Sequence, residues 1–144
     1  MNTCIKSLLK ISFVLAMSSV FSIHVMAQAP AKPKGKPWSA PDEYVKMKNP
    51  ITIDDSTLIN GKDLYTQHCK SCHGTKGKGD GAKADKIEIQ CGDFTSQEYI
   101  KESDGETYWK TTEGRKPMPS FKEKLSDTER WQVIYYIRSL AKSK

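Results

Sequence analysis

The sequence predicts a helical fold on the strength of three observations. Ser126 and Glu129 form an S-x-x-E capping box, and apolar residues follow them at helical spacing. A second stretch, from about Ser56 to Cys69, places its apolar residues along one helical face. Apolar–polar alternation is nowhere long enough to indicate a sheet. We therefore expect helices joined by loops.

Residues 1–27 are predicted to be a signal peptide. Lys6 and Lys10 precede an apolar run over residues 11–26, and small residues at its end supply a cleavage site after Ala27. The run is interrupted by serines and is shorter than the roughly 20 apolar residues that a membrane-spanning helix needs. We therefore expect export to the periplasm, with no stable membrane insertion.

Residues 28–54 are predicted to be an extended tail rich in proline and lysine. The whole sequence has a net charge of +6, but residues 28–50 alone carry +3 of it. Lys6 and Lys10 of the predicted signal peptide carry a further +2, so residues 51–144, which include the predicted folded domain (residues 55–144), carry only +1 and are almost neutral. A domain that binds nucleic acids would carry a basic surface, so we expect no nucleic-acid partner.

Within this domain the sequence predicts helices over about residues 56–69, 104–113 and 127–142. Gly61 lies inside the first and costs it about 1 kcal/mol relative to alanine. That cost is understandable if another helix crosses closely at this position. The glycine-rich residues 74–81 are expected to form a loop.

The C-x-x-C-H motif at Cys69, Cys72 and His73 carries the chemistry of this sequence. This spacing is the attachment pattern of a c-type haem. Two thiols three residues apart can form thioethers with neighbouring vinyl groups, and the histidine that follows them can ligate the iron. We therefore predict covalent attachment through Cys69 and Cys72, with His73 as an axial ligand.

Three other interpretations of the motif compete with haem attachment. A structural zinc site needs four ligands, and beyond the motif the mature chain adds only His68 and Cys91, at no zinc spacing. A thioredoxin-like redox pair would follow a strand, and no such strand is predicted. Two buried cysteines without a cofactor are the third alternative. Because the chain is predicted to be exported, its C-x-x-C-H motif favours haem attachment over these three alternatives.

Met118 is the predicted second axial ligand. It lies between Pro117 and Pro119, which stiffen the backbone, whereas Met47 falls in the tail. His68 directly precedes the attachment motif and is expected to lie on the same side of the haem as His73. A thioether ligand raises the reduction potential and blocks substrate access, which favours electron transfer. A peroxidase-type enzyme or a gas sensor would require Met118 to be absent from the iron.

Further motifs lie around the C-x-x-C-H segment, at residues 61–65, 69–74, 77–81, 104–110, 114–115, 118–121, 125–131 and 136–138. With these motifs, residues 57–142 resemble class I cytochrome c. The resemblance implies an all-α fold of three or more helices around one covalently bound haem. It also implies that the first and last helices cross near Gly61 and Tyr65, with Tyr136 as the aromatic partner.

The resemblance also marks positions around the haem. Arg115 and Trp109 match positions near the haem in similar proteins and are candidates to contact a propionate. Similar sequences often have a proline where this chain has Cys91, so the carbonyl that accepts the other ring N–H of His73 stays open. Cys91 itself is expected to be a buried free thiol or to link two molecules.

The predicted function is that of a periplasmic single-haem c-type cytochrome that carries electrons between redox proteins and is not an enzyme. The alternative is a cytochrome subunit, or electron-accepting partner, of a periplasmic oxidoreductase complex. A monomer is expected, with partners of dehydrogenase or oxidase type docking at the haem edge. Basic residues 70–86 and 115–124 are expected to surround that edge, and acidic residues 88–113 to lie elsewhere.

Overall fold

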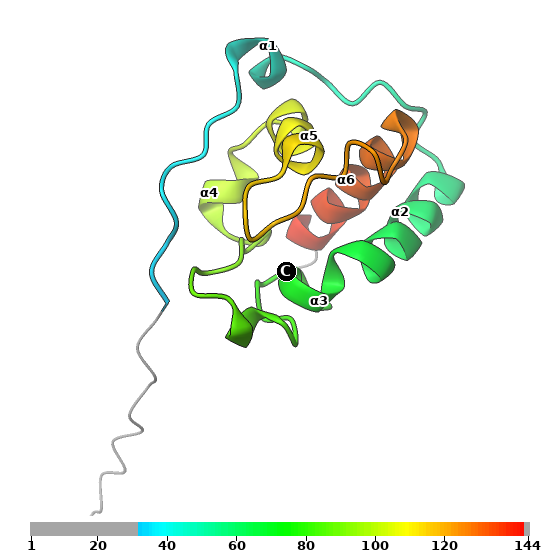
Figure 1. Cartoon of the computed structure of the whole chain (residues 1–144). Coiled ribbons are helices and arrows are strands. Elements are labelled where there is room, and N and C mark those ends of the chain that lie inside the picture. Colours follow the sequence, from blue (N-terminus) through cyan, green and yellow to red (C-terminus); the bar gives the residue numbers. More distant parts are fainter. Residues whose placement is uncertain (1–31, 143–144) are drawn as a thin grey trace, which may run out of the picture.

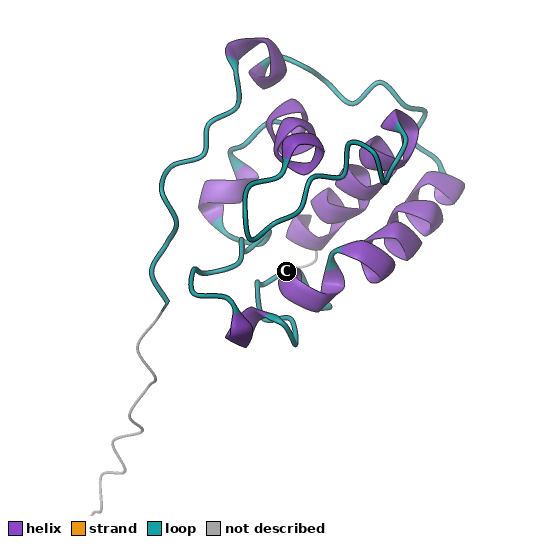
Figure 2. Ribbon diagram, viewed as in Figure 1, coloured by secondary structure: helices purple, strands orange, loops and turns teal. Residues whose placement is uncertain are grey.

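The computed structural model describes residues 32–142, so the predicted signal peptide lies outside the described residues. The described chain is helical, and its strand-like pairing is one isolated bridge between Arg115 and Met118 (Figures 1 and 2). The all-α fold is therefore confirmed. The elements are α1 (Asp42–Val45), α2 (Asp55–His68), α3 (Lys70–His73), the 3₁₀ turn η1 (Ala84–Lys86), α4 (Gln97–Ile100), α5 (Asp104–Glu113) and α6 (Asp127–Lys142).

Local capping explains where the long helices begin. In α5 the Ser103 hydroxyl accepts from the Glu106 amide at 3.1 Å, and the Glu106 carboxylate accepts from the Ser103 amide at 2.7 Å. Ser126 and Glu129 make the same reciprocal pair before α6, and these hydrogen bonds hold the pKa of Glu129 below its ordinary value. The predicted bounds of both helices agree with the structure.

α2 and α6 cross at Gly61, as the resemblance implied. A Cβ at Gly61 would overlap the Gln132 carbonyl oxygen and lie 2.9 Å from its carbon. Tyr65, one turn further along α2, packs against Tyr136 with ring centroids 5.2 Å apart. Glycine is therefore required by the close approach of the α6 backbone. The buried cluster around this crossing comprises Tyr65, Tyr99, Trp131, Val133, Ile134 and Ile137.

The Tyr65 side chain also fixes the chain that follows α2. Its hydroxyl donates a hydrogen bond of 2.6 Å to the Gly74 carbonyl, inside the core. Gly74 has a φ of +80°, a conformation that side chains other than glycine rarely adopt. The C-x-x-C-H segment is thus held between the end of α2 and a turn anchored on the core.

The tail is not simply extended. Residues 32–54 run along the domain and include the single-turn helix α1, which contacts α5 (Figure 1). A Cβ at Gly105 would overlap the Tyr44 carbonyl and lie 2.7 Å from the Met47 Cβ, so this segment packs tightly on α5. The Asn49 side chain donates to the Trp131 carbonyl at 3.2 Å. Composition did not predict this packing because a few long-range contacts anchor an otherwise polar segment.

No helix within residues 32–142 has the length and apolar character needed to cross a membrane.

Candidate functional site

A cavity of about 330 Å³ lies beside the C-x-x-C-H segment. Its walls come from the end of α2, α3, the loop after η1, α4, α5, the loop before α6, and α6 itself. Apolar side chains form much of the lining, among them Ile87, Ile89, Phe94, Phe121, Val133 and Ile137. The cavity can therefore hold a large, mainly apolar group with a few polar contacts.

Cys69, Cys72 and His73 all line this cavity. α3 is a single turn in which the Cys72 and His73 amides both donate to the Cys69 carbonyl, at 3.1 and 2.9 Å. Both cysteines are free thiols. Burial, together with the neighbouring Cys72, raises the pKa of Cys69 to about 12. The predicted attachment residues are thus brought together, unpaired, at one wall.

The His73 ring is oriented by its surroundings. Its Nδ1 lies 3.1 Å from the Gly92 carbonyl, and the ring stacks on Phe94 with centroids 4.5 Å apart. Since a carbonyl only accepts, Nδ1 carries the proton and Nε2 is left available as a metal ligand. Burial lowers the pKa of His73, which favours the neutral imidazole that binds metals. Gly92 is the carbonyl partner that the sequence left open.

Met118 lines the same cavity from the loop between α5 and α6. Its amide donates to the Arg115 carbonyl at 2.9 Å, and its carbonyl accepts from the Arg115 amide at 3.0 Å. The next part of the loop is tied to α5, because the Phe121 amide donates to the Thr111 carbonyl at 3.1 Å. The predicted second ligand is therefore held in the cavity wall by backbone hydrogen bonds.

The sequence model of the cytochrome c family matches residues 58–141, well over half of the chain. The chain belongs to the cytochrome c family. No curated protein sequence is significantly similar to this cytochrome. The family transfers electrons by means of a covalently bound haem c, and it is generally not enzymatic.

This chain is also similar to solved structures. A chain of the Kuenenia stuttgartiensis reducing HAO-like protein complex Kustc0457/Kustc0458 is 33% identical, with a TM-score of 0.57 over 74% of this chain. The cytochrome spans only about half, 51%, of that chain. The KustC0563 c-type cytochrome is 32% identical over 56% of this chain and 95% of its own, with a TM-score of 0.49.

The residues of the cavity fit a haem. Haem c requires two free thiols three residues apart and a neutral imidazole whose Nε2 is available, and the site has both. It also requires apolar surroundings, which the cavity lining supplies. Cys69 and Cys72 would hold the porphyrin edge through thioethers, and His73 would ligate the iron. When bound, the haem supplies one-electron chemistry, and the chain holds it, orients His73 and excludes water.

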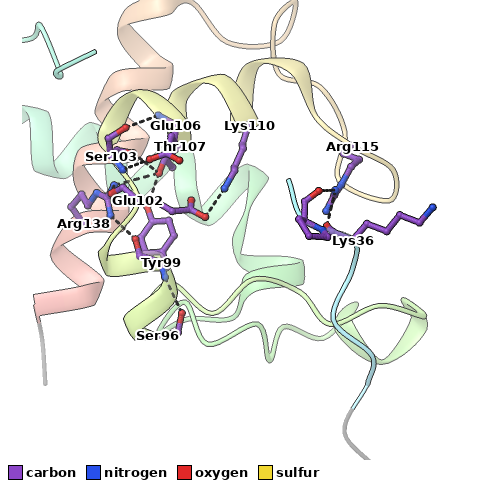
Figure 3. Close-up of polar contacts among 11 residues, drawn as sticks. Lys36, Ser96, Tyr99, Glu102, Ser103, Glu106, Thr107, Lys110, Arg115 and Arg138 are labelled. Carbon is purple, nitrogen blue, oxygen red and sulfur yellow. Dashed lines mark hydrogen bonds and ion pairs between the residues drawn. The ribbon is translucent and has the colours of Figure 1, made fainter. Parts of the chain in front are cut away.

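Arg115 and Trp109 occupy different places. Arg115 lines the cavity, but its Nη1 donates to the Lys36 and Pro37 carbonyls at 2.9 and 3.2 Å (Figure 3). Trp109 is not part of the cavity lining; it packs edge-on against Trp38, with centroids 6.1 Å apart. Trp38 lines the cavity instead. A contact from Trp109 to a propionate therefore remains a prediction that this placement does not support.

The expectation that acidic residues 88–113 lie away from the haem was wrong. Asp93, Glu98 and Glu102 line the cavity, because this segment also supplies the Gly92 carbonyl, α4 and α5. Lys110 pairs with Glu102 at 2.5 Å (Figure 3). Charges summed along the sequence could not reveal this, because the chain between His73 and Met118 has to form the walls of the cavity.

A polar network supports the wall formed by α4 and α5 (Figure 3). Arg138 of α6 donates to the Tyr99 and Glu102 carbonyls at 3.2 and 2.6 Å and pairs with Asp104 at 2.7 Å. The Thr107 hydroxyl lies 3.4 Å from the Tyr99 hydroxyl. Burial raises the pKa of Tyr99 to about 12, so its hydroxyl stays protonated. This network fixes α4 and α5 against the last helix.

Three residues of the cavity, Gly92, Phe94 and Trp38, were not predicted from the sequence. Gly92 and Phe94 follow Cys91 in a loop and carry no signal of their contact with His73. Trp38 did carry one, because a large aromatic residue is unusual in a proline- and lysine-rich tail and indicates an anchor point. His68, expected on the His73 side, lines the cavity and packs edge-on against Phe121 at 5.9 Å.

Cys91 is a half-buried free thiol that lines the cavity. Burial and the nearby Cys72 raise its pKa, and Lys32 opposes that shift. The thiol therefore stays mostly protonated and poorly nucleophilic at neutral pH. A disulfide between two molecules through Cys91 stays a prediction.

Proposed function

We propose that this cytochrome is a periplasmic single-haem electron carrier whose iron is ligated by His73 and Met118. The observation that carries the proposal is the shared cavity, which is lined by both residues and by the two attachment cysteines. The sequence holds one C-x-x-C-H motif, which supports one haem. The apolar run over residues 11–26 supports export.

The roles of the residues follow from their chemistry. The Gly92 carbonyl keeps the His73 proton on Nδ1 and so directs Nε2 to the iron. The Met118 thioether would ligate the iron, which would block access of a substrate and favour the ferrous state. The apolar walls keep water away from the haem, which limits the rearrangement that accompanies each electron transfer. A haem held in this way would supply the one-electron chemistry.

Met118→Ala tests the ligand assignment. Loss of the soft sulfur donor is expected to lower the reduction potential by on the order of 100 mV or more, since axial ligands set the potential of haem proteins. It is also expected to open the ferrous iron to carbon monoxide. A redox titration and carbon monoxide difference spectra measure both effects.

Two matched variants serve as controls for Met118→Ala. Met47→Ala removes a methionine from the tail and is expected to change neither measurement. His68→Ala removes the other candidate ligand in the cavity lining. A spectrum that is unchanged in the Met118 variant but altered in the His68 variant would identify His68 as the second axial ligand and refute the assignment of Met118.

A second candidate is the electron-accepting partner of an oxidoreductase complex. It is favoured by the similarity to a chain of the reducing HAO-like protein complex. Native electrophoresis of cell extracts, stained for haem, separates the two functions. A free carrier is expected to migrate at the size of the cytochrome alone, whereas comigration of its haem with a larger oxidoreductase supports the partner role.

A further inference from the structure

Residues 32–41, which we call the strap, run along one side of the domain (Figure 1) and are hydrogen-bonded to two of its loops. At one end the Lys32 ammonium donates to the Ala84 and Ile87 carbonyls at 2.5 and 2.8 Å. The Gln90 amide donates to the Pro33 carbonyl at 3.0 Å. This end of the strap is therefore bound to the loop that supplies Gly92, the partner of His73.

The other end of the strap is bound to the loop that supplies Met118. The Arg115 guanidinium donates to the Lys36 and Pro37 carbonyls and lies over the Trp38 ring, 4.6 Å from its centroid (Figure 3). On α5, Trp109 packs edge-on against Trp38 at 6.1 Å. Arg115 and Trp109 together fix the Trp38 ring.

Between its two anchors the strap contributes to the cavity. Trp38 is half-buried and lines the cavity, together with Arg115 and Ile89. A Cβ at Gly35 would lie 3.4 Å from both the Arg115 Nη2 and the Ile89 Cδ1, so the strap backbone is in close contact with the two loops. The strap thus joins the loop behind His73 to the loop of Met118.

We propose that the strap is a wall of the haem cavity and that Trp38 is its positioning residue, which excludes water and raises the reduction potential. The proposal rests on the proposed function, because it requires the haem to occupy this cavity. An apolar shell lowers the local dielectric constant and disfavours the additional positive charge of ferric iron. As part of the cavity wall, the strap would also limit the access of small ligands to the iron.

The test uses the full-length holoprotein with Trp38→Ala, Trp38→Phe and, as a control in the same segment, Ser39→Ala. Ser39 is exposed. Trp38→Ala is expected to lower the reduction potential and to make imidazole bind the ferric iron severalfold faster. Trp38→Phe keeps an aromatic ring in the wall and is expected to restore most of both properties, while Ser39→Ala matches the wild type.

Trypsin cleavage between Lys34 and Gly35 reports separately whether the strap has opened. Faster cleavage in Trp38→Ala, accompanied by the two changes above, supports the proposal. Faster cleavage with a wild-type potential and a wild-type imidazole rate overturns it, as do wild-type values of all three measurements. If Trp38→Ala does not retain haem, Trp38→Leu replaces it under the same criteria. Met118→Ala tests the proposed function independently. A negative result for Trp38 would therefore overturn the role of the strap without affecting the assignment of Met118.

Discussion

Replacing Cys69 and Cys72 together by alanine is expected to release the haem completely on denaturing electrophoresis and on extraction with acidic acetone. The two thiols are free, lie one helical turn apart and line the cavity, so they are placed to form both thioethers. Without them, His73 and the apolar walls hold the haem only by reversible contacts. Haem staining of the gel and the absorbance of the extract measure the loss.

Cys91→Ala is the matched control, because it removes a third thiol from the same cavity lining. It is expected to retain all of its haem on the gel. Haem that extracts freely from the wild-type protein would contradict covalent attachment and, with it, the central feature of the site.

Gly61→Ala is expected to lower the free energy of unfolding by about 2 kcal/mol, even though alanine is the better helix former. The added Cβ would overlap the Gln132 carbonyl oxygen and meet the Tyr136 Cβ at 3.0 Å. The first of these contacts involves the α6 backbone, so the two helices must separate to relieve it. Denaturant unfolding followed by far-ultraviolet circular dichroism measures the difference.

Asn60→Ala is the control for the helix crossing. Asn60 is the exposed neighbour of Gly61 in α2, so its variant changes helix propensity without adding an atom between the helices. It is expected to be as stable as the wild type or slightly more stable. Equal stabilities of the Gly61 and Asn60 variants would show that the crossing tolerates a side chain.

The long helices could be predicted because their signals are local. The capping boxes at Ser103 and Ser126 fix the starts of α5 and α6 through residues three positions apart. The single-turn helices α1 and α4 have no such periodicity. α1 packs on α5, and the Arg138 guanidinium of α6 holds the carbonyl of Tyr99 in α4. Their conformation therefore depends on contacts that no short window of sequence contains.

The same distinction applies to the site. That Cys69, Cys72 and His73 lie in one cavity with Met118 could be predicted, because attachment chemistry requires a fixed spacing and few other ligands exist; their roles toward a haem stay predictions. The Gly92 carbonyl and the Trp38 ring contribute through position alone, from segments distant in sequence. Family resemblance placed a tryptophan near the haem at Trp109, whereas the structure puts the Trp38 ring in the cavity wall and Trp109 behind it.

The crossing of α2 and α6 also sets the order of events during synthesis. The two helices stand at opposite ends of the domain in sequence, yet α6 supplies four of the six residues of the buried cluster, namely Trp131, Val133, Ile134 and Ile137. Contacts so far apart in the chain form only after a large loop has closed. A nascent chain that ends before Asp127 therefore lacks most of the buried cluster around Tyr65. Because Val133 and Ile137 of α6 also line the cavity, we expect its wall to be complete only once the last helix has been synthesised.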